Sequence, residues 1–202
     1  MTNNATGTES PNKPDAPNPA IASWFQVGSH WRGIGDPERY AKNMKCTECC
    51  EKHDELPDIG SAAPYQWRDD LDDAADSLLT EDLCIVDGED YFIRGVLEVP
   101  LVDQDDYFGW GVWVSLKKEN FETYREHFDS DTIGPFFGWL STEIDYFAET
   151  TLNLPTTVKF VGGGTRPRIF VNESDHQLRL DQRTGITLET AWRIVHQYTE
   201  EA

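Results

Sequence analysis

The chain has 202 residues, of which 37 are acidic and 17 basic, so its formal net charge at pH 7 is −20. Its length suits one domain with an extension, and an aromatic content of 12% supplies enough large side chains for a hydrophobic core. Such an acidic surface repels phosphate groups, which argues against binding to nucleic acids or to anionic membranes.

Residues 1–43 are predicted to form a disordered or loosely docked extension, and residues 44–202 a single α+β domain. The first twenty residues are rich in Asn, Thr, Ser and Pro and contain no apolar segment typical of a secretion signal. Four cysteines without such a signal favour reduced thiols, so we expect a cytoplasmic protein. No apolar run reaches the ~18 residues that a transmembrane helix needs.

The most informative motif begins the predicted domain, where Cys46-x-x-Cys49 is followed by Cys50 and His53. Two cysteines at this spacing can bind one metal ion or form a redox pair, and they can also be buried or idle thiols. A structural zinc ion needs four ligands. The predicted zinc ligands are Cys46, Cys49, His53 and either Cys84 or His176.

The next segments predict one helix and three strands. Asp69–Thr80 has apolar residues at helical spacing and aspartates on the opposite face, which predicts an amphipathic helix. Leu83–Val86, Tyr91–Leu101 and Phe108–Leu116 are rich in β-branched and aromatic residues and predict strands. The acidic link between the last two strands lacks the Gly and the distal Glu of a calcium loop, so we expect a hairpin turn there.

The rest of the chain predicts two helices and a hairpin. Lys117–Phe128 is expected to be a helix capped by Ser115, and Thr187–Tyr198 a helix that closes the domain. Thr156–Val161 and Arg168–Asn172 are expected to pair as a hairpin. This order predicts an α+β fold with an antiparallel sheet, flanking helices and an N-terminal Cys-x-x-Cys knuckle.

A series of short motifs occurs in a characteristic order from Met44 onward. These motifs are Cys46-x-x-Cys49 with His53, Leu83–Gly88, Phe92–Pro100, Trp110–Leu116, Glu119–Phe121, Phe137–Ser141, Thr151–Leu154, Arg166-Pro167, Asp175-His176 and Gln182-Arg183-x-Gly185-Ile186-Thr187. Together they resemble an uncharacterised prokaryotic family, domain of unknown function 2199. The chain departs from the family pattern at Cys50, where Gly is usual, and at Gln177, where Pro is usual. The resemblance implies a fold and little about function.

Two further patterns could bind a ligand. Gly162-Gly163-Gly164 precedes two arginines and could cradle an anion near His176; the alternative is a hairpin turn whose arginines pair with acids. Phe108-Gly109-Trp110 and Phe137-Gly138-Trp139 repeat a tripeptide in which Gly lets a ligand or a ring lie on the backbone; the alternative is that both are core aromatics of the sheet. The candidate ligand-binding residues are Arg166, Arg168, His176, Trp110 and Trp139.

The acidity has two interpretations. Acids spread along the domain are typical of a halophilic protein, because high salt in the cytoplasm screens their mutual repulsion. A basic protein partner is the other interpretation. We favour the first, because the acids do not gather in one segment.

No complete catalytic motif is present in the sequence. We therefore expect a non-catalytic cytoplasmic binding or interaction module with a zinc-stabilised knuckle. One alternative is a small-molecule enzyme that uses His176, Arg166 and Arg168 around an anionic ligand. Another is an acidic inhibitor of a basic protein.

Overall fold

A long antiparallel hairpin of β7 (Asp90–Pro100) and β8 (Tyr107–Leu116) forms the centre of the sheet. The computed structural model describes residues 25–28, 44–45, 52–53, 56–172 and 174–200. Tyr91 lies opposite Leu116 and Pro100 opposite Tyr107, so the two strands pair along their whole length. The prediction of these two strands and of their antiparallel pairing is confirmed.

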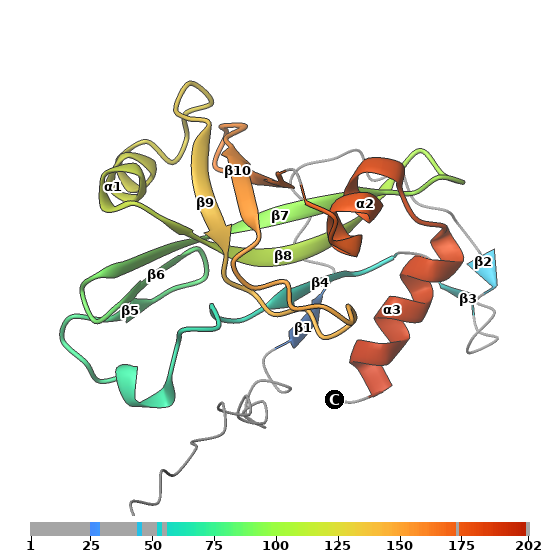
Figure 1. The fold of residues 1–202 in the computed structure, drawn as a ribbon, viewed down its shortest axis with the longest axis horizontal. Coiled ribbons are helices and arrows are strands. Elements are labelled where there is room, and N and C mark those ends of the chain that lie inside the picture. Colours follow the sequence, from blue (N-terminus) through green and yellow to red (C-terminus); the bar gives the residue numbers. More distant parts are fainter. Residues whose placement is uncertain (1–24, 29–43, 46–51, 54–55, 173, 201–202) are drawn as a thin grey trace, which may run out of the picture.

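Five strands close into a barrel (Figure 1). β9 (Phe136–Leu140) pairs with β8, β10 (Pro155–Lys159) with β9, and β11 (Arg168–Val171) with β10, all antiparallel. β11 then pairs in parallel with β7, where Arg168 lies opposite Val96, and this contact closes the ring. The predicted hairpin that precedes the last helices is confirmed as β10 and β11.

The outer edges of the central hairpin also carry strands outside the barrel. β4 (Asp58–Ser61) runs parallel to β8, and β6 (Leu83–Val86) runs antiparallel to β7. Both edges of the hairpin are therefore shared between a barrel strand and a flanking strand. Four short strands are also described: β1 (Phe25–Gly28) beside β4, β5 (Leu78–Leu79) beside β6, and the separate antiparallel pair β2 (Met44–Lys45) and β3 (Lys52–His53).

Three α-helices of the described residues pack around these strands. α1 (Lys118–Glu126) lies against β7, α2 (Gln177–Thr184) packs on β7 and β11, and α3 (Leu188–Glu200) lies beside β4. The Leu188 amide donates a hydrogen bond to the Asp103 carboxylate at 3.0 Å, so the turn between β7 and β8 satisfies an amide at the start of α3. The apolar residues at helical spacing along α3 are all buried, namely Leu188, Ala191, Trp192, Val195 and Tyr198.

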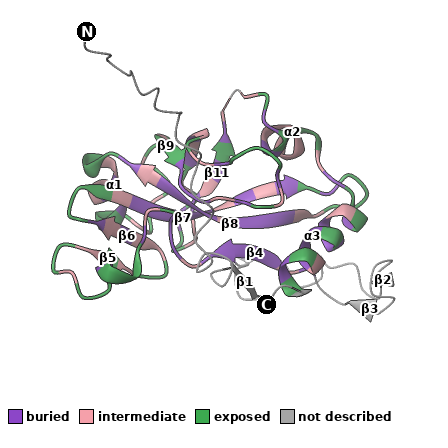
Figure 2. Ribbon diagram, turned by 60° about the horizontal axis from the view of Figure 1, so that its bottom comes forward, coloured by how far each residue is buried: buried purple, intermediate pink, exposed green. Residues whose placement is uncertain are grey.

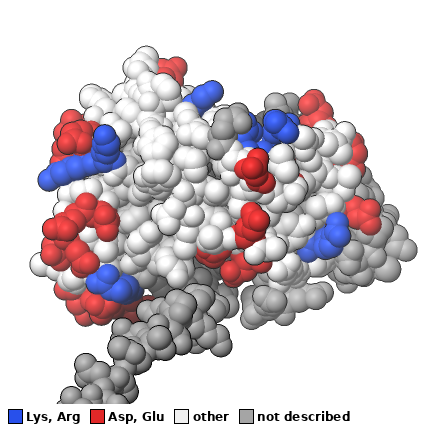
Figure 3. Space-filling model, in the orientation of Figure 1, with Lys and Arg blue, Asp and Glu red and all other residues white. Residues whose placement is uncertain are grey.

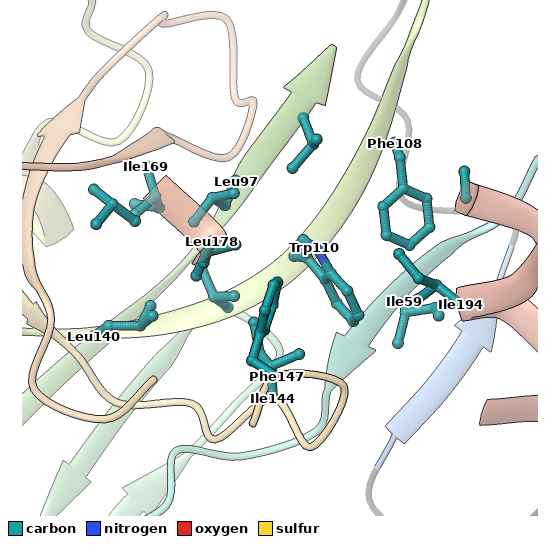
Figure 4. Packing of buried hydrophobic residues seen from close by; sticks show 14 of the residues in the cluster. Ile59, Leu97, Phe108, Trp110, Leu140, Ile144, Phe147, Ile169, Leu178 and Ile194 are labelled. Atoms are coloured by element: carbon teal, nitrogen blue, oxygen red, sulfur yellow. The ribbon is translucent and has the colours of Figure 1, made fainter. Parts of the chain in front are cut away.

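Two hydrophobic clusters lie on opposite faces of the central hairpin, whose strands are largely buried (Figure 2). Alternation along β7 sends Phe92 into one cluster and Ile93 into the other. The larger cluster fills the barrel and continues to α3, and Figure 4 shows Trp110 between Phe147 and the side chains of β4 and α3. The smaller cluster consists of Ala63, Trp67, Leu71, Cys84, Val86, Phe92 and Trp113.

The helix predicted over Asp69–Thr80 is wrong. The segment forms a short 3-10 turn over Asp69–Leu71, then further turns and the strand β5, where Leu78 pairs with Ile85. Leu71 is buried, but Leu78 is exposed, so the apolar residues do not share one covered face. Aspartate favours turns over helix interiors, and pairing with β6 outweighs the helical spacing of the leucines.

The predicted cap of α1 is also wrong, because Ser115 lies within β8 and Lys117 precedes the helix without a side-chain capping bond. The α+β class is confirmed. The sheet is mixed rather than antiparallel, since the β4–β8 and β11–β7 pairs are parallel. The cysteines of the predicted knuckle lie outside the described residues, and of the predicted extension only Phe25–Gly28 is described.

Candidate functional site

The two arginines near the Gly triplet form ion pairs with acids, one just before β6 and one in β7. Arg166 precedes β11, and its Nε lies 2.5 Å from Oδ1 of Asp82. Arg168 begins β11 and pairs with Glu98 of β7. These contacts are the ones that the hairpin-turn interpretation expects.

The Gly triplet has all three residues in the left-handed region, with φ values of 70°, 64° and 69°. The Gly163 amide donates to the Asp129 carbonyl at 3.1 Å. A side chain built on Gly164 would begin 3.3 Å from a carboxylate oxygen of Asp129. A carboxylate at this distance repels an anion, so the loop is poorly suited to cradle one.

His176 immediately precedes α2 and caps it. Its Nδ1 accepts a hydrogen bond from the Leu178 amide at 3.0 Å, and its Nε2 lies 3.1 Å from the Glu149 carbonyl oxygen. Because Nδ1 accepts, the proton is on Nε2, which donates to Glu149. The ring is buried and packs edge-on against Phe147. These contacts hold the imidazole against backbone groups, and none of them involves either arginine.

The capping contact gives a testable result. We expect His176→Ala to lower the free energy of unfolding by about 1–2 kcal/mol, because it removes the cap and the bond to Glu149. His176→Asn is the matched variant, since an Asn side chain can accept from the Leu178 amide and should lose less than half as much. Urea denaturation measures both, and equal losses would contradict the capping role.

The two tripeptide repeats place their aromatic residues on opposite faces of the barrel wall. In the first, Phe108 and Trp110 are buried and meet edge-to-face at 5.0 Å. In the second, Phe137 and Trp139 have the same edge-to-face contact at 5.0 Å but are 49% and 47% exposed. The core-aromatic interpretation therefore holds for the first repeat and is wrong for the second.

The glycines of the repeats admit neighbouring protein groups. A side chain on Gly109 would begin 2.5 Å from Oδ1 of Asp58, which accepts the Gly109 amide at 3.0 Å. A side chain on Gly138 would begin 2.5 Å from the Ser115 carbonyl oxygen. Close approach of the Asp58 side chain at Gly109 and of β8 at Gly138, rather than of a ligand, accounts for both glycines.

The predicted zinc ligands are only partly described. His53 lies in β3, opposite Met44 of β2, while Cys46 and Cys49 lie outside the described residues. Cys84 is fully buried in the smaller hydrophobic cluster, and burial raises the pKa of its thiol to about 12. Within the described part of the chain, no group of three His, Cys, Asp or Glu side chains is placed to hold a metal ion. The zinc site stays a prediction.

A buried arginine lies on the face of the central hairpin that carries the smaller hydrophobic cluster. Arg94 is 2% exposed, and burial, together with the nearby Arg166, lowers its pKa to about 10. Its guanidinium lies 5.8 Å from the centre of the Trp113 ring. A side chain on Gly60 would begin 2.8 Å from an Arg94 nitrogen, so this glycine makes room for the guanidinium.

An exposed aromatic surface lies on the outside of the barrel, and we call it the aromatic face. It consists of Phe137 and Trp139 on β9 and Phe170 on β11, which is 37% exposed. Thr157 of β10 lies between Phe137 and Phe170 in the strand register. Figure 3 shows few charged side chains over β9, while acidic and basic ones lie to the right of this surface, some near the middle of the view. An aromatic surface with few charges on so acidic a protein is typical of a binding interface.

A pocket of about 420 Å³ adjoins this face, and we call it the acidic pocket. Its acids are Glu98 on β7 and Asp105 and Asp106 in the turn before β8. The remaining lining residues are Pro100, Tyr107, Phe170, Val171, Arg179 and Gln182. Phe170 thus belongs to both the pocket and the aromatic face, while Arg166, Arg168 and His176 do not line the pocket.

Sequence reasoning identified Trp139 and missed most of this surface. The alternation of Phe137, Gly138, Trp139 and Leu140 is typical of a strand with one exposed face and could have revealed β9. The pocket had no such signal, because it joins residues of β7, β8, β11 and α2 that lie far apart in the sequence.

Comparison with protein families gives a match that covers the barrel. Residues 45–186 match the model of a family described as an uncharacterised protein conserved in bacteria (DUF2199). No curated protein and no solved structure matches the chain significantly. Among the described residues, none of the helices has the length and apolar character needed to cross a membrane. The match spans well over half of the chain, which therefore belongs to the family of domain of unknown function 2199.

Proposed function

We propose that this protein is a non-catalytic binding module that holds a protein partner on its aromatic face. The observation that supports the proposal most is the exposure of Phe137, Trp139 and Phe170 on a surface with few charges. Aromatic side chains supply most of the binding energy at many interfaces, because they bury much area with few rotatable bonds.

The position of these side chains on strands also favours binding. β9, β10 and β11 are central strands of the barrel, each paired on both edges. Backbone pairing therefore holds the aromatic face in place before a partner arrives, which reduces the entropy lost on association.

The enzyme alternative has weaker support. It requires Arg166, Arg168 and His176 to converge on one ligand. Each of the three is instead engaged with another group: the arginines with Asp82 and Glu98, and the histidine with backbone groups at both ring nitrogens.

A phage-displayed library of random peptides tests the binding proposal. We expect selection on the wild-type protein to yield peptides that bind Phe137→Thr/Trp139→Thr about 10-fold or more weakly, as for central interface aromatics. Threonine suits a strand, and the two side chains are half-exposed, so the double variant should keep the fold.

Leu78→Thr is the matched control, because Leu78 is an exposed apolar residue on β5, outside the barrel. The selected peptides should bind this variant as they bind the wild type. Failure to select any peptide, or equal binding to all three proteins, would contradict the proposal. Circular dichroism confirms that each variant is folded.

A further inference from the structure

We propose that the acidic pocket receives a lysine or arginine side chain of the partner, so that the partner segment is both apolar and basic. This inference rests on the proposed function and names the chemistry of the partner. It draws on the position, the charge and the walls of the pocket.

The position of the pocket lets one segment reach both surfaces. Phe170 lines the pocket and also belongs to the aromatic face, so no gap separates the two. Phe137 lies two strands from Phe170 in the barrel, which corresponds to about 10 Å at the usual strand spacing. An extended peptide spans that distance with about three residues. A short segment can therefore cover the aromatic face and place its next side chain in the pocket.

The charge of the pocket favours a cation. Glu98, Asp105 and Asp106 contribute three acidic groups, against Arg179 in the lining and Lys159, whose ammonium lies over the ring of Phe170. Arg168 offsets Glu98 from outside. Asp106 uses one carboxylate oxygen to accept the Tyr107 amide at 2.8 Å, a bond that orients the carboxylate at the pocket. The two turn aspartates are therefore the groups most available to a cationic side chain.

The walls of the pocket suit the stem and the head of a long basic side chain. Tyr107 and Phe170 supply aromatic surface beside the acids. The Lys159 ammonium lies 4.7 Å from the centre of the Phe170 ring, so one face of this ring already holds a cation of the chain itself. Lysine and arginine combine an apolar stem with a charged head and so match such a mixed surface.

The charge of the whole molecule acts in the same direction. A net charge of −20 attracts basic partners from a distance and speeds their encounter with the protein. This long-range attraction has no preferred place on the surface. The pocket would direct the basic side chain to one site. An experiment must therefore separate the effect of the pocket carboxylates from the effect of the net charge.

The test uses two pentapeptides with blocked ends, one alternating lysine and tryptophan and one alternating glutamine and tryptophan. Binding to the full chain is measured by calorimetry in about 0.1 M salt, where charge interactions remain unscreened over short distances. We expect the wild type to bind the lysine peptide about 10-fold more tightly than the glutamine peptide.

Two charge-matched double variants locate this preference. Asp105→Asn/Asp106→Asn removes the turn carboxylates, and the side-chain amide oxygen introduced at position 106 could still accept the Tyr107 amide. Asp72→Asn/Asp73→Asn removes two exposed carboxylates outside the pocket. We expect the preference for lysine to fall about 5-fold in the first variant and to change less than about 2-fold in the second.

The outcomes separate this inference from the proposed function. Equal loss of the preference in both double variants, or no binding of the lysine peptide, would overturn the inference. Binding of the glutamine peptide that depends on Phe137 and Trp139 but shows no pocket effect would leave the proposed function standing alone. A pocket effect that survives Phe137→Thr/Trp139→Thr unchanged would support the pocket and contradict the aromatic face.

Discussion

Trp110→Ala should lower the free energy of unfolding by about 3–5 kcal/mol, the usual range for removing a buried tryptophan. Trp110 is 2% exposed and sits where the barrel core meets α3. It contacts Phe108 at 5.0 Å, Tyr198 of α3 at 5.8 Å and Phe147 at 6.4 Å between ring centres. Its loss would leave a large cavity and would weaken the attachment of α3 to the sheet.

Trp139→Ala is the matched comparison, because it removes the same side chain from the same tripeptide. Trp139 is 47% exposed, so we expect a loss of less than about 1 kcal/mol. Urea denaturation followed by far-ultraviolet circular dichroism measures both variants without relying on tryptophan fluorescence. Similar losses in the two variants would contradict the opposite placement of the repeats.

Gly138→Ala should destabilise the protein by about 3 kcal/mol or more, which is the upper range for adding a methyl group where no space exists. The new Cβ would lie 2.5 Å from the Ser115 carbonyl oxygen and also against the Val114 side chain. Val114 and Ser115 are the β8 residues that pair with β9, so relief of the clash would separate the two strands.

Gly163→Ala tests whether any methyl group on a glycine would have this effect. Nothing lies within 4 Å of the position of its Cβ, but its φ of 64° disfavours alanine. We expect a loss of about 1 kcal/mol, from backbone conformation alone. A loss for Gly138→Ala no larger than for Gly163→Ala would show that the β8–β9 contact can expand at little cost.

The fold could be predicted from sequence where local pattern and tertiary packing agree. Apolar residues recur along β7, β8 and α3 at the spacing of a strand or a helix, and the apolar face of each element is buried. Asp69–Thr80 has an equally clear helical pattern, but pairing of Leu78 with Ile85 draws its end into the sheet. The barrel closes where Arg168 of β11 lies opposite Val96 of β7, and no local sequence pattern predicts a pair so far apart in the chain.

In the candidate site, too, local sequence pattern predicts some features, while contacts between distant segments determine the others. Arg166, Arg168 and His176 are close in sequence, but the turn between β11 and α2 separates their environments and gives each its own partner. Trp139 was a candidate because of its tripeptide, and alternation along β9 explains why its ring is exposed. The acidic pocket could not be predicted, since its lining comes together only when α2 packs on β7 and β11.

The parallel contact that closes the barrel also bears on how the chain reaches its native state. The β7–β8 and β10–β11 hairpins join segments that are near one another in the chain, so they can form early and independently. The β7–β11 pair must wait until the intervening helix α1 and strand β9 are in place, because a long loop has to be ordered first. Until then β7 and β11 expose unpaired edges that can join the edges of other chains. A strongly negative chain keeps its copies apart during that interval, so the acidity that surrounds the finished domain also protects the unfinished one from aggregation.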